Sequence, residues 1–405
     1  MLLVTLLVIF LSLPSVQTKL AVKLTDHLQT VYDAEISIDR IGLNWLGKID
    51  ARGVHIKDHH QDTLIYSKQV QTNILSFSNA IKGDVSLGYI KLTDAKLFVK
   101  TYKDELKDNM YTFVNSFNSG DKRSSIFKLF GDDVVIENSH IKITDENLSS
   151  PLLFDLKKVH AVAKEFRIIG PEFFANVQSI SLSATRGFEI EALKTQFSYT
   201  TKEMILKDMK LQTAQSMLLG DLVMNYETNG FSDFENTVVF RGDFLESKIA
   251  TNDLNGFYNE FGTNPILDFK GSFNGTLNDF SFTKGSIGTG NTKIAGDFYF
   301  KDLVKGTNAF KINFKRHDIT TSYYDLRRFL PNILGPLLPD ELKNLGVFDY
   351  DGNTQINTTK LVTKATFLSG IGRAEAILTI DDYSNTDRAT YSENLSSDPY
   401  TNLTT

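Results

Sequence analysis

Five residues in one short segment carry the side chains that most often bind metal ions. They are His55, Asp58, His59, His60 and Asp62. Imidazole nitrogens and carboxylate oxygens suit a transition metal when they converge from a strand end and the turn that follows it. A polar hairpin turn explains the same residues without a ligand. The sequence therefore predicts no metal site.

The run GSIGTG at residues 285–290 is the nearest approach to a phosphate-binding loop. No strand-to-helix pattern surrounds it and no Gly-Lys-Ser/Thr ending follows, so a glycine-rich hairpin is expected. The sequence has no cysteine, which excludes thiolate metal sites and cysteine nucleophiles. It also contains neither a nucleophile elbow nor an HExxH run. We expect a protein that is not an enzyme, with no catalytic residue and no cofactor.

The charge of the chain argues against nucleic acid as a partner. The 405 residues include 43 Lys and Arg against 49 Asp and Glu, which gives a net charge of -6. A protein that neutralises phosphates needs a basic excess, which this composition does not supply. The 30 Phe and 15 Tyr favour pleated sheet as the main structure.

The N-terminus is the most apolar part of the chain. Residues 1–18 are predicted to be a membrane anchor helix, whose apolar members are Leu2, Leu3, Val4, Leu6, Leu7, Val8, Ile9, Phe10, Leu11 and Leu13. A helix of ~13 residues reaches about 20 Å, so the span either continues past Pro14 or lacks an upstream part. A removed signal peptide is the alternative, although the segment after Pro14 matches a cleavage site poorly. Residues 19–33 follow as an amphipathic linking helix.

From Ile36 onward the apolar period changes to two. In the clearest run, Leu267, Phe269 and Phe273 alternate with polar residues. We count ~16 such runs, with three short helical stripes near residues 106–117, 254–261 and 323–330. The sequence predicts a mainly β protein in which one long, curved and twisted antiparallel sheet forms an open apolar groove. The predicted groove lining is Ile141, Ile143, Phe188, Ile190, Phe197, Tyr199, Leu267, Phe269, Phe273, Leu277, Phe298, Phe300, Phe310, Ile312 and Phe314.

A loose repeat pairs glycine with aspartate before apolar strand residues. It occurs at residues 220–222, 242–244 and 296–298. A glycine inside a strand marks a bulge or a bend, and repeated bulges curve a sheet. We expect these positions to bend the strands.

Seven short stretches carry a resemblance to a known family: residues 13–17, 36–38, 53–58, 62–66, 252–262, 275–279 and 323–332. They resemble the N-terminal part of TamB-type translocation and assembly module proteins. The resemblance covers nearly the whole chain but includes no catalytic motif. It places the chain beside the AsmA-like and bridge-type lipid-transfer group.

The resemblance implies an inner-membrane protein, single-pass, with its bulk in the periplasm and an apolar β-groove. It implies phospholipid transfer and assistance to outer-membrane protein assembly or secretion. The implied partners are membrane lipids and an Omp85-type outer-membrane barrel protein. The family's C-terminal domain, which meets that barrel, has no counterpart before Thr405.

The expected domain plan has four parts. The anchor and the linking helix precede a β-groove domain at residues 34–380, and a polar tail at residues 381–405 is expected to be a truncated part of further β-repeats. Two other folds fit the alternation. One is an anchored structural or adhesive β-sandwich without lipid transport, in which the apolar face meets a second sheet. The other is a transmembrane β-barrel, which leaves the N-terminal anchor unexplained.

Overall fold

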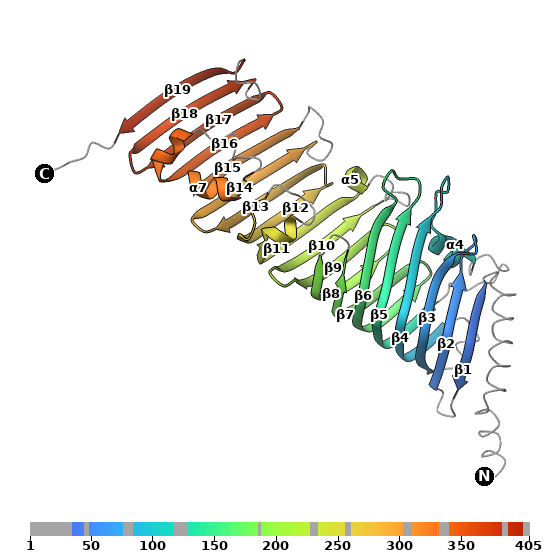
Figure 1. Ribbon diagram of the computed structural model, residues 1–405. Coiled ribbons are helices and arrows are strands. Elements are labelled where there is room, and N and C mark those ends of the chain that lie inside the picture. Colours follow the sequence, from blue (N-terminus) through green and yellow to red (C-terminus); the bar gives the residue numbers. More distant parts are fainter. Residues whose placement is uncertain are drawn as a thin grey trace, which may run out of the picture. The chain divides into compact units, whose positions relative to one another are not determined.

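The computed structural model describes most of the chain. The described residues are 35–43, 48–75, 84–116, 128–184, 188–226, 234–255, 261–302, 310–329, 331, 340–382 and 388–399. Strands dominate them, as Figure 1 shows, and the prediction of a mainly β protein is confirmed.

Nineteen strands belong to one sheet. The first nine are β1 (Ile36–Leu43), β2 (Lys48–Lys57), β3 (Thr63–Ile74), β4 (Asp84–Thr101), β5 (Lys128–Asp145), β6 (Leu152–Ile169), β7 (Glu172–Ser183), β8 (Glu189–Tyr199) and β9 (Glu203–Gln212). The other ten are β10 (Met217–Asn225), β11 (Val239–Ala250), β12 (Ile266–Gly275), β13 (Asp279–Thr289), β14 (Thr292–Lys301), β15 (Lys311–Ser322), β16 (Val347–Asn357), β17 (Lys360–Ser369), β18 (Gly372–Asp381) and β19 (Thr390–Pro399).

The described helices are short. They are α4 (Asn109–Ser116), α5 (Phe234–Thr237), α6 (Thr251–Leu254), α7 (Tyr323–Phe329) and the 3₁₀-helix η3 (Asp340–Leu345). Helix α7 begins where the Ser322 hydroxyl accepts a hydrogen bond from the Asp325 amide at 3.1 Å and donates one to the Asp325 carboxylate at 2.7 Å. This reciprocal cap satisfies an amide at the start of the helix, which lacks a partner inside it.

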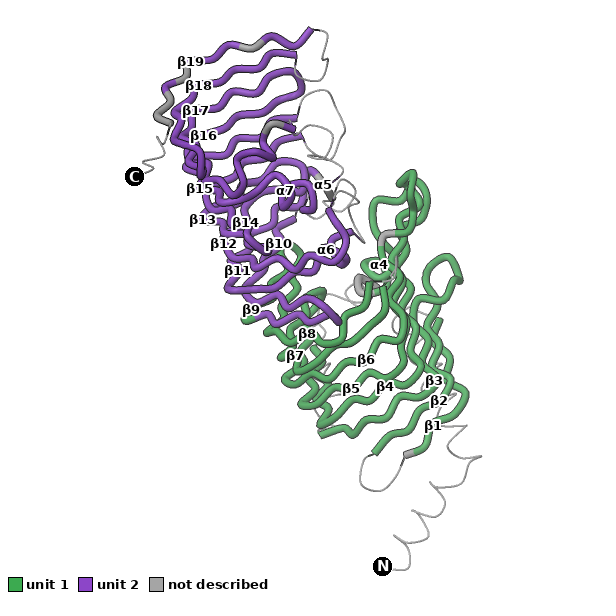
Figure 2. Tube along the Cα trace, turned by 60° about the vertical axis from the view of Figure 1, so that its left-hand side comes forward, with its two compact units in different colours: residues 1–208, 227–232 green, residues 209–226, 233–405 purple. Residues whose placement is uncertain are grey.

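The chain divides into two compact units, coloured separately in Figure 2. The first contains residues 1–208 and 227–232, and the second contains residues 209–226 and 233–405. In the first unit β1 to β8 pair consecutively, and in the second β10 to β19 do the same. The polar segment after residue 380 contributes β19, so the pairing extends past the predicted groove domain at 34–380.

One pair departs from the predicted antiparallel order. Strands β4 and β5 are parallel, with Ile90 beside Val134 and Leu97 beside Ile141. Parallel neighbours need a long crossover in place of a tight turn. The chain between Thr101 and Lys128, which includes α4, has the length for such a crossover. The helical stripe predicted near residues 106–117 lies in this segment, but the sequence pattern did not predict the change of strand direction.

Residues in the left-handed region bend the strands at bulges. Asn138, Glu165, Lys284 and Arg316 have φ between 47° and 54° and lie at register shifts between paired strands. A bulge leaves a backbone amide without its ladder partner. Here side-chain oxygens of the next strand accept these amides: Asp297 accepts from Lys284 at 2.9 Å, and Asn353 accepts from Arg316 at 3.0 Å.

The predicted glycine–aspartate repeat therefore has a structural meaning in the second unit. Gly220 and Gly296 both lie at register shifts, with φ of 144°. Asp297, which follows Gly296, supplies the carboxylate for the bulge of β13. The hydrogen bond from the Lys284 amide, together with one from Arg316, lowers the pKa of Asp297. The predicted bend is confirmed at Gly220 and Gly296. It is wrong at Gly242, which stays in regular register with Leu222 and Phe273.

The predicted membrane anchor is not part of the described structure. Residues 1–18, including the ten apolar anchor residues, and residues 19–33 lie outside the described residues. Where the structure is described, no helix has the length and apolar character to cross a membrane, since the longest, α4, has 8 residues. A span needs ~20. The described structure therefore gives no support for the predicted single-pass inner-membrane protein with its bulk in the periplasm, and that prediction is not retained.

Replacing Gly352 by alanine should destabilise the second unit. Gly352 has φ of 156°, and an added Cβ would overlap the carbonyl oxygen of Lys364 on β17. We expect Gly352→Ala to lower the free energy of unfolding by about 1–3 kcal/mol, measured by urea denaturation. Gly288→Ala is the matched control, because its added Cβ would have no neighbour nearer than 3.8 Å. Equal midpoints for the two variants would contradict the role given to Gly352.

Candidate functional site: an aromatic face and a polar cluster

Strand register aligns phenylalanines across the second unit. Phe273 of β12 is paired with Phe282 of β13, which is paired with Phe298 of β14, and this in turn with Phe314 of β15. Paired residues of neighbouring strands point to the same face of a sheet. The register therefore sets four rings in one row across four strands.

A second row runs beside the first. Phe280 of β13 is paired with Phe300 of β14, which is paired with Ile312 of β15. Because side chains alternate along a strand, this row shares the face of the first row. Two phenylalanines of β11 contact the rings of β12, Phe240 against Phe273 and Phe244 against Phe269.

The rings contact one another from β11 to β15. Ring centroids are 5.5 Å apart for Phe244 and Phe269, and 5.0 Å for Phe269 and Phe282. The distances from Phe273 to Phe280, from Phe280 to Phe300 and from Phe298 to Phe314 are 4.8, 4.7 and 5.1 Å. These separations are those of stacked and edge-to-face aromatic pairs. We call the nine residues of this network the aromatic face: Phe240, Phe244, Phe269, Phe273, Phe280, Phe282, Phe298, Phe300 and Phe314.

The opposite face of the same strands is polar. Asn274 is paired with Ser281, which is paired with Tyr299 and then Asn313. Each of these residues is next in sequence to a member of the aromatic face. The sheet thus separates apolar from polar side chains within single strands.

Glycines make room for the rings. A Cβ on Gly271 or Gly285 would collide with the ring of Phe282, and one on Gly242 would collide with the ring of Phe244. Rings that lie over glycines cover backbone that would otherwise face solvent.

The aromatic face is only partly shielded from water. Of its nine members, Phe282 and Phe298 are buried and the other seven are half-buried. The described helices of this unit contact strand ends, α6 against β11 and α7 against β15. A β-sandwich would need a second sheet, whereas the described strands form one. The structure therefore favours an open sheet over the sandwich.

The row changes character after β15. Phe314 is paired with Thr354 of β16, which is paired with Thr363 of β17. His317 is 2% exposed and bonds the Thr354 hydroxyl through Nε2 at 2.9 Å. Burial lowers the pKa of this histidine. A hydrogen-bonded polar patch therefore ends the aromatic row.

The structure places the predicted groove residues on several strands. Leu267, Phe269 and Phe273 on β12, Phe298 and Phe300 on β14, and Ile312 and Phe314 on β15 share the face just described. Leu277 lies between β12 and β13, and Phe310 directly precedes β15. Four phenylalanines of the aromatic face were not predicted from the sequence: Phe240, Phe244, Phe280 and Phe282. The alternation at residues 279–283 was a readable signal for Phe280 and Phe282.

The first unit has a smaller group of rings. The ring centroids of Phe197 and Tyr199 on β8 lie 4.9 Å and 5.6 Å from the ring centroid of Phe173 on β7. Ile141 and Ile143 of β5 are paired with Leu156 and Phe154 of β6. The remaining two predicted residues lie at the β7–β8 connection, where Ile190 is paired with Leu182 and Phe188 precedes β8.

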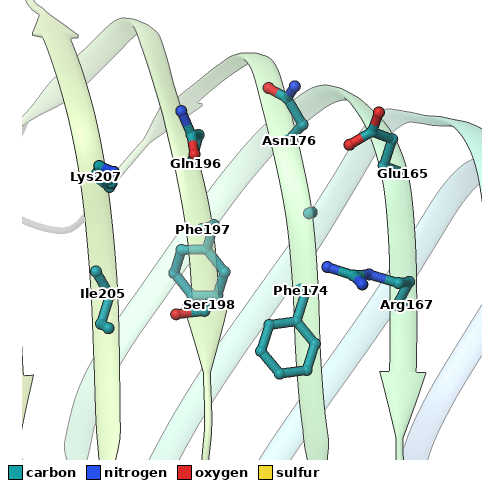
Figure 3. Close-up of a pocket in the computed structure, with 10 residues that line it drawn as sticks. Glu165, Arg167, Phe174, Asn176, Gln196, Phe197, Ser198, Ile205 and Lys207 are labelled. Carbon is teal, nitrogen blue, oxygen red and sulfur yellow. The ribbon is translucent and has the colours of Figure 1, made fainter.

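A shallow hollow of about 320 Å³ lies over strands β6 to β9 of the first unit (Figure 3). Glu165, Arg167 and Lys207 are its charged members, and the Arg167 guanidinium lies 5.4 Å from the centre of the Phe174 ring. Its lining brings together no pair of carboxylates and no histidine. Apolar side chains, among them Phe174, Phe197 and Ile205, share the lining with these charged groups.

The histidine cluster of the sequence is rearranged in the structure. His59 and His60 lie in the turn between β2 and β3. Both are close to Glu105, which belongs to the segment that follows β4. Nε2 of His59 is 3.0 Å from one carboxylate oxygen of Glu105, and Nε2 of His60 is 2.6 Å from the other. These hydrogen bonds, the one from His60 first, lower the pKa of Glu105. His55 instead bonds the Thr63 hydroxyl at 2.9 Å.

Asp58 is the centre of the polar network beneath this turn. The residue is 5% exposed, and its carboxylate accepts hydrogen bonds from the backbone amides of His60 and Asp62 at 2.9 and 3.0 Å. It also accepts the Tyr102 hydroxyl at 2.8 Å and the Asn109 amide at 2.7 Å. Burial acts to raise the pKa of Asp58, but these hydrogen bonds outweigh it and the pKa is lowered.

Comparison with known proteins adds no family to this picture. No family model matches the chain, and no curated protein matches it significantly.

Removing the charge of Asp58 should weaken the first unit in a pH-dependent way. We expect Asp58→Asn to lower the free energy of unfolding by about 1–3 kcal/mol at neutral pH, because the asparagine NH₂ group replaces one carboxylate oxygen and so faces two of the four donors. The folded-state pKa of Asp58 is lowered, so its contribution is present above the ordinary value of 3.8 and is lost as the pH falls through the folded-state pKa. Urea denaturation across this range should show the two proteins converging at acid pH.

The exposed Asp132 on β5 offers a matched control. Asp132→Asn should leave the urea midpoint at neutral pH unchanged. If Asp58→Asn matched Asp132→Asn at neutral pH, the buried network would not stabilise the fold as described.

Proposed function

We propose that the aromatic face of the second unit binds lipid acyl chains and that the protein transfers lipids along it. The observation that carries this proposal is the unbroken sequence of ring contacts from β11 to β15 on a face that is half open to solvent.

The chemistry of the face favours an apolar occupant. Its nine members are all phenylalanines, which offer large apolar area and no hydrogen-bonding group. A sugar, nucleotide or peptide backbone would lose hydrogen bonds to water on such a surface without replacement. An acyl chain has no polar group to satisfy and gains from leaving water.

The dimensions of the row suit one acyl chain. From β11 to β15 there are four strand spacings of ~4.8 Å, which gives a row of about 19 Å. One leaflet of a bilayer takes about half of the ~30 Å hydrocarbon thickness, so an acyl chain extends roughly 15 Å. The chain would lie across the strands, along the row of rings.

The resemblance to TamB-type proteins supports the same function. Those proteins belong to a group associated with phospholipid transfer and with outer-membrane protein assembly. Contact with an Omp85-type barrel protein is part of the proposal through the resemblance alone. In this proposal the protein acts by binding and release, without catalysis.

Photo-crosslinking at neighbouring residues should separate the two faces. A photo-reactive amino acid at Ile312 should crosslink to lipid, because Ile312 is in register with Phe300 of the aromatic face. The same probe at Asn313, one residue along on the polar face, is the control and should yield little lipid adduct. Mass spectrometry of the adducts after incubation with phospholipid vesicles measures both. A protein–protein adduct at Ile312 in place of a lipid adduct would identify a second copy as the occupant and reject the proposal.

A charge on the aromatic face should block transfer while leaving the fold intact. Phe273→Arg interrupts the row, but the long side chain can direct its guanidinium to the open side, so backbone pairing remains. We expect the rate of fluorescent-lipid transfer between vesicles to fall at least about tenfold, with an unchanged circular dichroism spectrum.

Asn274→Arg, on the polar face of the same strand, should transfer lipid at the parent rate. Transfer that survives Phe273→Arg in a folded protein would contradict the proposed path. Unfolding of Phe273→Arg alone would indicate a closed core at this position and would argue for the sandwich.

A further inference from the structure

Two loops far apart in sequence bring three potential metal ligands together in the first unit. The candidate ligand atoms of His59, His60 and Glu105 all lie within 4.8 Å of one another. Glu105 is separated from His60 by 45 residues, so no local sequence pattern predicts that the three residues meet. The carboxylate faces both imidazoles, one with each oxygen.

Asp58 and Tyr102 hold the turn that contains the two histidines. The Asp58 carboxylate accepts the His60 amide, and the centroid of the His60 ring lies 3.8 Å from that of Tyr102. Tyr102 in turn bonds Asp58 through its hydroxyl. These contacts fix the backbone and one ring of the turn independently of Glu105.

Glu105 is positioned by its own backbone. Its amide donates to the Tyr102 carbonyl at 3.0 Å, and its carbonyl accepts the side-chain amide of Asn147 at 3.0 Å. Both halves of the group therefore rest on ordered neighbours. Ligand preorganisation of this kind is what a metal site requires.

We propose that His59, His60 and Glu105 bind a divalent transition metal, with Zn²⁺ the best fit. Ligands of a tetrahedral zinc ion lie about 3.3 Å apart when metal–ligand distances are ~2.0–2.1 Å. The three candidate ligand atoms lie within 4.8 Å of one another, so their separations need to change by no more than about 1.5 Å to reach that value. Two imidazoles and one carboxylate suit zinc, whereas Ca²⁺ and Mg²⁺ prefer oxygen ligands.

The surrounding charge also favours a cation. The hydrogen-bonded cluster contains the carboxylates of Asp58, Asp62, Glu105 and Glu146, and the ammonium of Lys100 lies between two of them, 3.6 Å from Asp62 and 2.9 Å from Glu146. Asp58 and Asp62 are not ligands in this proposal, because their carboxylates bind Tyr102 and Asn109 and are not in the group of ligand atoms that lie within 4.8 Å of one another. The fourth coordination position is left to solvent.

A metal at this place has a structural consequence. It ties the β2–β3 turn to the segment that leaves β4 and starts the crossover to the parallel strand β5. Metal binding to the folded state adds to its stability. The site is independent of the proposed lipid function, since its residues lie in the other unit from the aromatic face.

The test is titration of the purified full chain with Zn²⁺ after removal of metals by a chelator. We expect one site by calorimetry, a rise in the melting temperature with Zn²⁺, and no rise with Mg²⁺ or Ca²⁺. His59→Ala and Glu105→Gln should each weaken zinc binding at least about tenfold and remove the rise.

Two variants elsewhere on the first unit serve as controls. His140 forms another histidine–carboxylate pair, 2.6 Å from Asp155, and Glu137 forms an ion pair with Lys91 at 2.9 Å. His140→Ala and Glu137→Gln should bind zinc as the parent does. Absence of zinc binding by the parent, or binding that is unchanged in both ligand variants, would overturn the proposal. An equal rise with Ca²⁺ would reject the assigned ligand chemistry.

Discussion

Water is excluded from one face of a single-layered sheet only if something covers that face. Backbone hydrogen bonds are satisfied between neighbouring strands, so the ladder itself sets no limit on strand number. Side chains do limit the number of strands, because an apolar face that stays in contact with water does not gain the free energy of burial. In the second unit the rings cover one another and the glycines beneath them, and this reduces the exposed area without closing the face.

The bulges resolve a second conflict. A strand that bends leaves amides without partners, and such amides are costly when they are shielded from water. Asp297 and Asn353 accept these amides from the neighbouring strand, so the bend of one strand depends on a polar side chain of the next. The polar face therefore stabilises the bent backbone that presents the rings on the other side. Each face of the sheet has a separate physical task.

Alternation along single strands made much of the fold predictable. Leu267 to Phe273 of β12 show period two without interruption, and the structure has this strand as predicted. Phe244 was missed because the bulge that follows it shifts the register and hides the period. The parallel pairing of β4 with β5 was missed because it depends on where a crossover returns, which no local pattern encodes. Glu105 was missed for the same reason, since its neighbours His59 and His60 come from another hairpin.

Consecutive pairing also governs how such a protein would unfold and fold. Within each unit, a strand makes its extensive contacts with the strands before and after it in sequence. Contacts between sequence neighbours close short loops, and this favours rapid nucleation at any hairpin. A stack of this kind behaves as a one-dimensional array, in which stability is the sum of local terms and nearest-neighbour terms. Loss of one strand would then fray the strands beside it first, and distant hairpins would keep their native pairing.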